Sequence, residues 1–126
     1  VLDPFDELEE VADFARMKIG GGGKETVMAL FFNSRKQMLQ YRCFPGTVDR
    51  TILFPREVIE LCLGYKAKVL ILVHSHPSGL CFPSDEDIAL TRKLQIATEA
   101  HDIHFADHLI VAPSNFFSMR AGNFII

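Results

Sequence analysis

An unbroken aliphatic run, Val69 to Val73, most constrains how this 126-residue chain folds. A strand with one face in water alternates apolar and polar residues, whereas a strand covered on both faces shows no such alternation. The run therefore predicts a strand over Lys68–His74 that lies inside a sheet with both faces covered. Two histidines, His74 and His76, stand at its C-terminal end.

The rest of the chain supplies further strands and the helices that cover them. Pro55 and Ser84 mark helix starts, because Pro suits the first helical turn and Ser caps it. The order of elements predicts an α/β (α+β) fold in which a mixed β-sheet is flanked by helices. The predicted elements are strands at Thr26–Asn33 and Gln37–Phe44 joined as a hairpin, a helix at Pro55–Tyr65, a helix from Asp85, and short strands at Asp107–Ala112 and Phe116–Met119.

The N-terminal segment predicts one more helix. From Pro4 to Ile19 apolar residues recur every three or four positions, with acidic residues early and basic residues late, as in an amphipathic helix matched to its own dipole. Gly20–Gly23 ends this helix. We therefore divide the chain into an N-terminal helix (1–19), a glycine linker (20–24) and a main domain (25–126).

Composition excludes several classes of protein. With 48% apolar and 23% charged residues, the chain is typical of a globular domain. Its three cysteines form no C-x-x-C pair, which excludes a disulfide framework and a sulfur-rich zinc site. The sequence has no charged-then-apolar leader and no apolar run near the roughly 20 residues of a membrane helix. We expect a cytoplasmic protein that does not bind membranes.

Three residues around the end of the central strand suggest a metal site. His74 and His76 lie two positions apart, so their side chains point to the same face if the chain stays extended. Asp87 follows eleven residues after His76, in the first turn of the next helix. Three ligands of these types leave a fourth position open for water, as in catalytic zinc sites. The same set would also accept iron, cobalt or manganese.

Simpler interpretations exist for each of these residues. The histidines could only bond backbone carbonyls, and Ser84 with Asp87 could be only a capping box at the helix start. Their combined order and spacing favour the metal site.

The pattern His74-x-His76-Pro77, seven residues, Ser84-x-x-Asp87 resembles the signature of the JAMM (MPN-plus) metallohydrolases. Within that family the chain is most similar to the bacterial RadC-like branch, over Glu25 to about Ser118. Matches to the branch pattern are Gly46-Thr47, Pro55-Arg56-Glu57, His76-Pro77-Ser78-Gly79, Pro83-Ser84, Asp87-Ile88 with Thr91, and Asp107-His108-Leu109-Ile110.

The resemblance implies a three-layer JAB/MPN (cytidine-deaminase-like) fold and a zinc-dependent hydrolase of JAMM type. One Zn²⁺ per chain would be held by His74, His76 and Asp87. Glu25 would be the general base that accepts a proton from the attacking water, and Ser84 would donate a hydrogen bond to the developing oxyanion. The substrate would be a protein or peptide, cleaved at a peptide or isopeptide amide bond.

The chain departs from the branch pattern in two places. Ser75 stands where RadC-like proteins usually carry Asn, at a position that is not a ligand in the JAMM pattern. The helical DNA-binding-type domain usual in the branch has no match here beyond the single helix before Gly20. Since the sequence begins with Val1 and not with Met, we expect the chain to be one domain of a longer protein.

Two other functions stay open at this point. The RadC resemblance favours a DNA-repair-associated protein that acts with nucleic acid or repair partners. A metal-binding interaction module without catalysis is the second alternative. The residues name neither the substrate nor the oligomeric state.

Two further segments have a predicted place near the metal. Asp107 or His108 could orient a zinc ligand from behind, although a purely structural role suits them equally. The loop Ser78–Pro83 joins the two ligand-bearing elements and carries Leu80 and Phe82, which predicts an apolar wall that controls access to the metal. The alternative is that both side chains tuck into the core.

We expect this chain by itself to bind duplex DNA weakly at physiological salt. Its net charge is −3 and its 13 Lys and Arg residues are dispersed, so few phosphates would be neutralised at once. Fluorescence anisotropy of a labelled duplex, titrated at several salt concentrations, measures this. Submicromolar affinity with a steep salt dependence would contradict the expectation and favour the repair function.

Overall fold

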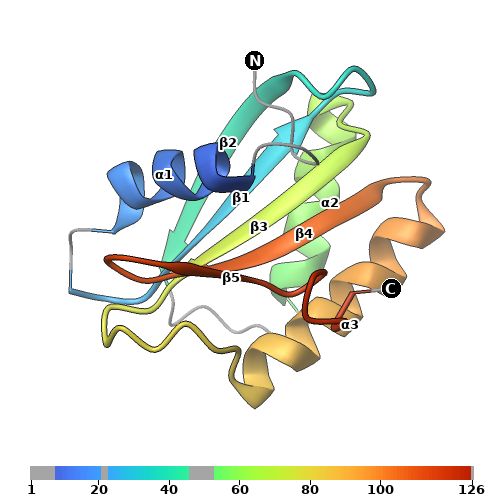
Figure 1. Ribbon diagram of the computed structural model, residues 1–126. Coiled ribbons are helices and arrows are strands. Elements are labelled where there is room, and N and C mark those ends of the chain that lie inside the picture. The colour runs from blue at the N-terminus through green and yellow to red at the C-terminus, as the bar shows by residue number, and fades with distance from the viewer. Residues whose placement is uncertain (1–7, 21–22, 46–52, 126) are drawn as a thin grey trace.

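The computed structural model describes residues 8–20, 23–45 and 53–125. This part of the chain forms a five-stranded mixed sheet in the order β2-β1-β3-β4-β5, with helices on both faces (Figure 1). Its elements are α1 Leu8–Ile19, β1 Thr26–Phe32, β2 Met38–Pro45, α2 Leu53–Tyr65, β3 Val69–Ser75, α3 Asp85–Ala100, β4 His104–Val111 and β5 Phe116–Ser118. None of these helices is both long and apolar enough to cross a membrane.

Three predicted features lie outside the described residues. They are the first residues of the N-terminal helix (4–7), the glycines at 21–22, and the motif Gly46-Thr47.

The central strand β3 organises the sheet. It runs antiparallel to β1 on one side and parallel to β4 on the other. All seven of its residues are buried, which confirms a strand covered on both faces. Burying a Val, Leu or Ile side chain stabilises a fold by about 1.5–3 kcal/mol, so the aliphatic run holds β3 firmly in place. Whatever follows the C-terminal end of β3 is therefore attached to the buried central strand of the sheet.

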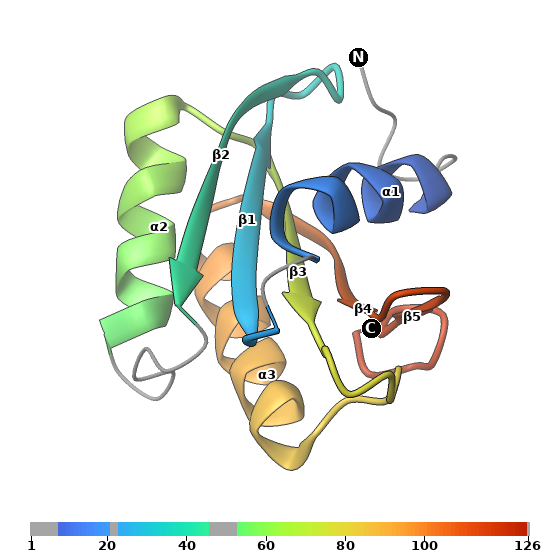
Figure 2. The same cartoon turned by 90° about the vertical axis from the view of Figure 1, so that its left-hand side faces the viewer.

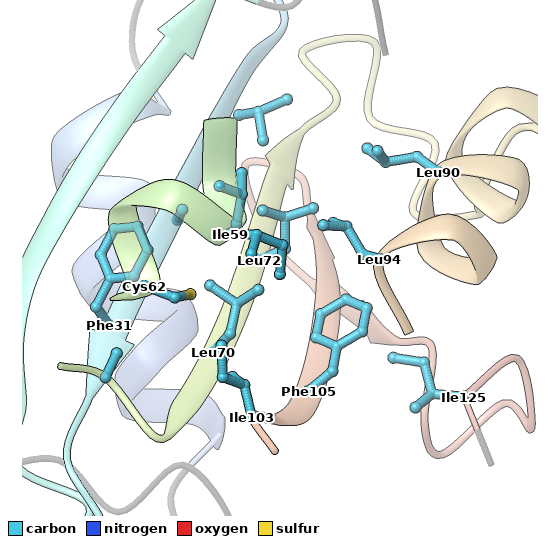
Figure 3. Close-up of a cluster of buried hydrophobic side chains, with 14 of the residues drawn as sticks. Phe31, Ile59, Cys62, Leu70, Leu72, Leu90, Leu94, Ile103, Phe105 and Ile125 are labelled. Carbon is cyan, nitrogen blue, oxygen red and sulfur yellow. The ribbon is translucent and has the colours of Figure 1, made fainter. Parts of the chain in front are cut away.

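Two helical layers enclose this sheet. On one face, Leu70 and Leu72 of β3 pack in the same cluster as Leu90 and Leu94 of α3 (Figure 3), and α2 covers the same face. On the other face, α1 packs in a second cluster that includes Val73 (Figure 2). The predicted α/β fold with a helix-flanked mixed sheet is confirmed, and its three layers agree with the JAB/MPN architecture.

Strand and helix boundaries differ from the predicted ones at two places. β4 begins at His104, three residues before Asp107, because Phe105 and Ala106 also fill the core. The polar pair Asp107-His108 interrupts the apolar pattern there and hides the true start. α2 begins at Leu53, so Pro55 lies inside its first turn instead of opening it. The hairpin of β1 and β2 is antiparallel, as predicted.

The N-terminal helix is attached to the sheet by polar as well as apolar contacts. Val11, Ala12 and Ala15 are fully buried against the sheet. The Arg16 guanidinium donates hydrogen bonds to the carbonyl of Ala112 at 2.9 Å and to that of Asn115 at 3.1 Å. The segment boundaries drawn at the glycines stay a prediction, but α1 packs as a layer of the same body.

Two glycines allow a matched test of this fold. Gly64→Ala in α2 should raise the free energy of unfolding by about 0.4–1 kcal/mol, because an added Cβ meets nothing within 4 Å and restricts the unfolded chain. Gly20→Ala should lower it, because its Cβ would lie 2.5 Å from the Arg16 carbonyl oxygen. Urea denaturation measures both changes. A shift of the same sign in both variants would contradict this account of the end of α1.

Candidate metal centre

Both histidines project from the C-terminal end of β3. The alternation along the strand puts His74 on the face of Leu72, which α3 covers, and its side chain is only 1% exposed. His76 follows the strand, and its backbone N–H donates to the carbonyl of Val111 at 2.8 Å. The two rings lie edge to face with centroids 4.9 Å apart. The predicted convergence of the two imidazoles is therefore present.

Asp87 reaches the same point from the start of α3. Ser84 caps this helix, and the reciprocal bonds of a capping box join it to Asp87: the Asp87 N–H donates to Ser84 Oγ at 3.1 Å, and the Ser84 N–H donates to Asp87 Oδ2 at 2.9 Å. The fully buried carboxylate also places Oδ1 2.7 Å from His74 Nδ1 and Oδ2 3.3 Å from His76 Nε2. The Asp87 carboxylate thus takes part in the capping box and also contacts both histidines.

The surroundings of Asp87 favour its charged form. Burial by itself would raise the pKa of this carboxyl group. The hydrogen bond and charge of His74, together with the backbone N–H of Ser84, outweigh burial and hold the pKa well below its usual range. The group is therefore ionised at neutral pH, as a metal ligand must be.

The hydrogen bonds assign the tautomers of the two rings. The ionised Asp87 accepts, so His74 Nδ1 carries a proton, and in the neutral ring Nε2 is the nitrogen that holds the lone pair. The carbonyl of Leu80 accepts from His76 Nδ1 at 2.8 Å, which turns Nε2 of His76 toward Glu25 and Asp87. Both imidazoles thus present Nε2 as a ligand atom.

Glu25 approaches this pair of nitrogens from the start of β1. Its carboxylate oxygens lie 4.0 Å from His74 Nε2 and 3.8 Å from His76 Nε2, and the side chain is 52% exposed. Ligand atoms of Glu25, His74 and His76 all lie within 4.8 Å of one another, so these three residues could hold an ion. The predicted neighbourhood of Glu25 and the two histidines is present.

Ser75 fixes the segment that carries Glu25. Its hydroxyl oxygen accepts the Thr26 N–H at 2.9 Å and lies 3.5 Å from the Lys24 carbonyl, so it contacts both neighbours of Glu25. From the sequence, Ser75 is recognised only as a departure from the usual Asn. Its place between two histidines, on the opposite face of the strand, was the signal for a supporting role.

The ligand assignment itself stays a prediction. Ligand atoms on a tetrahedral zinc ion with bonds of ~2.0–2.1 Å are separated by about 3.3–3.4 Å. The 3.3 Å between Asp87 Oδ2 and His76 Nε2 fits that spacing, and the distances from Glu25 are longer. The 3.3 Å distance is compatible with Asp87 as the third ligand, but Asp87 contacts His74 through Nδ1 and not through Nε2. A set of Glu25, His74 and His76, with Asp87 orienting His74, is the one whose ligand atoms all lie within 4.8 Å of one another.

Ser84 can combine its capping role with a catalytic one. Its Oγ receives the Asp87 N–H through a lone pair, which leaves its own hydroxyl proton for another acceptor. The side chain is exposed at the start of α3. The capping bond therefore leaves Ser84 able to donate a hydrogen bond.

A second set of buried polar groups stands behind the centre. The Thr91 hydroxyl donates to the Asp87 carbonyl at 2.7 Å and accepts from His108 Nδ1 at 2.7 Å. The His108 ring is parallel to that of His74, with centroids 6.3 Å apart. Asp107 is turned elsewhere and binds the backbone N–H of Arg120 at 3.1 Å. Asp107 also accepts the backbone N–H of His108 at 2.7 Å, so of the predicted pair only His108 bonds Thr91 directly.

Comparison with known proteins agrees with this geometry. A family model described as the RadC-like JAB domain matches residues 5–124. The chain belongs to this family. The match includes all of the described part of α1 as well as the sheet.

Relatives in several bacteria carry the name UPF0758 protein. The one from Dechloromonas aromatica is 40% identical over 111 residues, which cover 87% of this chain and 49% of the relative. The one from Streptococcus sanguinis is 38% identical over 113 residues, covering 89% of this chain and 50% of the relative. The one from Actinobacillus pleuropneumoniae serotype 5b is 35% identical over 102 residues, covering 80% and 46%. The chain thus spans about half the length of these relatives.

Removing the Thr91 hydroxyl tests the hydrogen bonds that link Asp87 to His108. Thr91→Val should lower the free energy of unfolding by about 1–3 kcal/mol, because it leaves the buried His108 N–H without its acceptor. Thr98→Val is a matched control, since Thr98 is equally buried on α3 but bonds only carbonyls of its own helix, Leu94 and Gln95. Urea denaturation compares them. Equal losses would contradict a specific role for the Thr91 network.

Proposed function

We propose that this domain is a metal-dependent hydrolase that cleaves peptide or isopeptide amide bonds. The observation that carries the proposal is the convergence of His74 Nε2, His76 Nε2 and the Glu25 carboxylate at one edge of the sheet. The buried Asp87 carboxylate lies beside His76 Nε2 and is bonded to His74 Nδ1. Membership of the RadC-like JAB family supports it.

The donor set fits a divalent cation. His76 Nε2 lies 3.3 Å from the ionised oxygen of Asp87 and 3.8 Å from Glu25. Facing lone pairs repel each other, so a positive charge is required between them, either a proton on Nε2 or a cation. Two imidazoles with carboxylate oxygens suit zinc. We assign His74, His76 and Asp87 as its ligands.

The ion and the chain's own groups would divide the chemistry between them. A bound zinc ion supplies Lewis acidity, which lowers the pKa of water to about 7. Glu25, half exposed beside the histidines, accepts a proton on its carboxylate and passes it to the leaving amine. The free hydroxyl proton of Ser84 donates to the oxygen that becomes negative when the amide carbonyl is attacked.

We propose a protein or peptide as the substrate for this chemistry. Nothing in the charge of the domain favours nucleic acid, because acidic residues outnumber Lys and Arg by 16 to 13. The relatives are about twice as long as the matched region, so partners of a whole protein of that length would depend on sequence beyond this domain.

We expect Glu25→Gln to abolish amide cleavage while the metal is retained. Loss of general base catalysis lowers a rate by roughly 10²–10⁴-fold, and the glutamine cannot accept the proton. The protein is purified without chelator or nickel resin, its metal content is measured by elemental analysis, and cleavage of a random peptide library is followed by mass spectrometry.

Two further variants make this test specific. Glu99→Gln changes a glutamate at the other end of α3, about 18 Å along the helix from Asp87, and should alter neither metal content nor cleavage. His76→Ala should empty the site. If Glu25→Gln empties it as well, Glu25 is a ligand and the assigned roles are wrong. A loaded wild-type protein that cleaves nothing would instead favour a metal-binding interaction module.

A further inference from the structure

Two large apolar side chains stand in water on the loop between β3 and α3. Leu80 is 71% exposed and Phe82 is 65% exposed. The alternative in which both tuck into the core is therefore wrong. Exposing such side chains is unfavourable by about 25 cal/mol for each Å² of apolar surface, so a surface of this kind beside a reactive site calls for an explanation.

The loop is held in this position by contacts on both sides of Phe82. The Leu80 carbonyl accepts from His76 Nδ1 at 2.8 Å, and Cys81 Sγ lies 2.9 Å from Asn115 Oδ1. Pro83 is buried, and Ser84 begins the cap of α3. The backbone is thus fixed while the two apolar side chains point outward.

Phe82 also extends an aromatic row that reaches back to the core. Its ring lies 5.6 Å from the ring of Phe117 on β5, and Phe117 lies 6.2 Å from Phe124. Phe117 and Phe124 are partly buried against the main core cluster. The row supports Phe82 from one side and leaves its exposed surface for a ligand.

We propose that Leu80 and Phe82 bind a large apolar side chain of the substrate, next to the amide bond that is cleaved. This specificity rests on the proposed function. Phe82 is two residues before Ser84, so their Cα atoms are at most about 7.6 Å apart. A peptide whose carbonyl oxygen accepts from Ser84 would place a neighbouring side chain within reach of Phe82. The carbonyl of Leu80, through His76, ties the same loop to the metal centre.

Three hexapeptides that differ only at their third position, with phenylalanine, alanine or lysine there, provide the probes. Each is titrated into zinc-loaded, ¹⁵N-labelled protein, because NMR shifts detect millimolar binding whether or not the peptide is cleaved. We expect the phenylalanine peptide to bind about tenfold more tightly than the alanine peptide, with shifts at Leu80, Phe82 and Phe117. Equal binding of all three, shifts confined to other surfaces, or no shifts at millimolar peptide would overturn the proposal.

A pair of variants separates this site from general apolar binding. Phe82→Ala should remove most of the preference for phenylalanine without unfolding the protein, since the ring is mostly exposed. Ile96→Ala removes an equally exposed apolar side chain from α3 and should keep the preference. Retained preference in Phe82→Ala would contradict the assignment.

Mass spectrometry of the same samples distinguishes this proposal from the proposed function. Preference without cleavage contradicts hydrolysis and supports the apolar binding site. Cleavage without preference supports hydrolysis and contradicts the site.

Discussion

The buried carboxylate of Asp87 is the interaction on which the rest of the centre depends. One oxygen accepts from His74, and the other accepts the backbone N–H of Ser84 while lying beside His76. A fully buried carboxylate is tolerated only when its lone pairs have partners. Here the partners belong to β3 and to the start of α3, so satisfying the charge also fixes the helix against the end of the strand.

The remaining groups of the centre are supported from the sheet. Pairing of β1 with β3 brings Val27 opposite His74, and Ser75 holds the residues on both sides of Glu25. The centre therefore combines rigid nitrogen donors with a carboxylate that remains half exposed. That difference suits the proposed roles, because ligands must be held still whereas a proton carrier must reach both water and the leaving group.

The same loop that joins the two ligand-bearing elements serves two purposes. Through the Leu80 carbonyl it fixes the tautomer of His76, and through Leu80 and Phe82 it presents apolar surface to the solvent. A substrate bound on that surface would contact residues that are covalently continuous with the centre. Binding and chemistry would then be coupled through a few fixed backbone bonds instead of through a large movement.

The sequence by itself determined the elements whose signals are local. The aliphatic run predicts β3 as a fully buried strand, and Ser84 with the acids after it predicts the start of α3, because periodicity and capping depend on near neighbours. The motif of His74, His76 and Asp87 also predicted which residues meet. Only the tertiary structure decided how they meet: the tautomers of the two rings, the support from Ser75 and Thr91, and the outward position of Phe82. These features arise from contacts between residues far apart in the chain, such as Ser75 with Lys24 and His108 with Thr91, which no local pattern encodes.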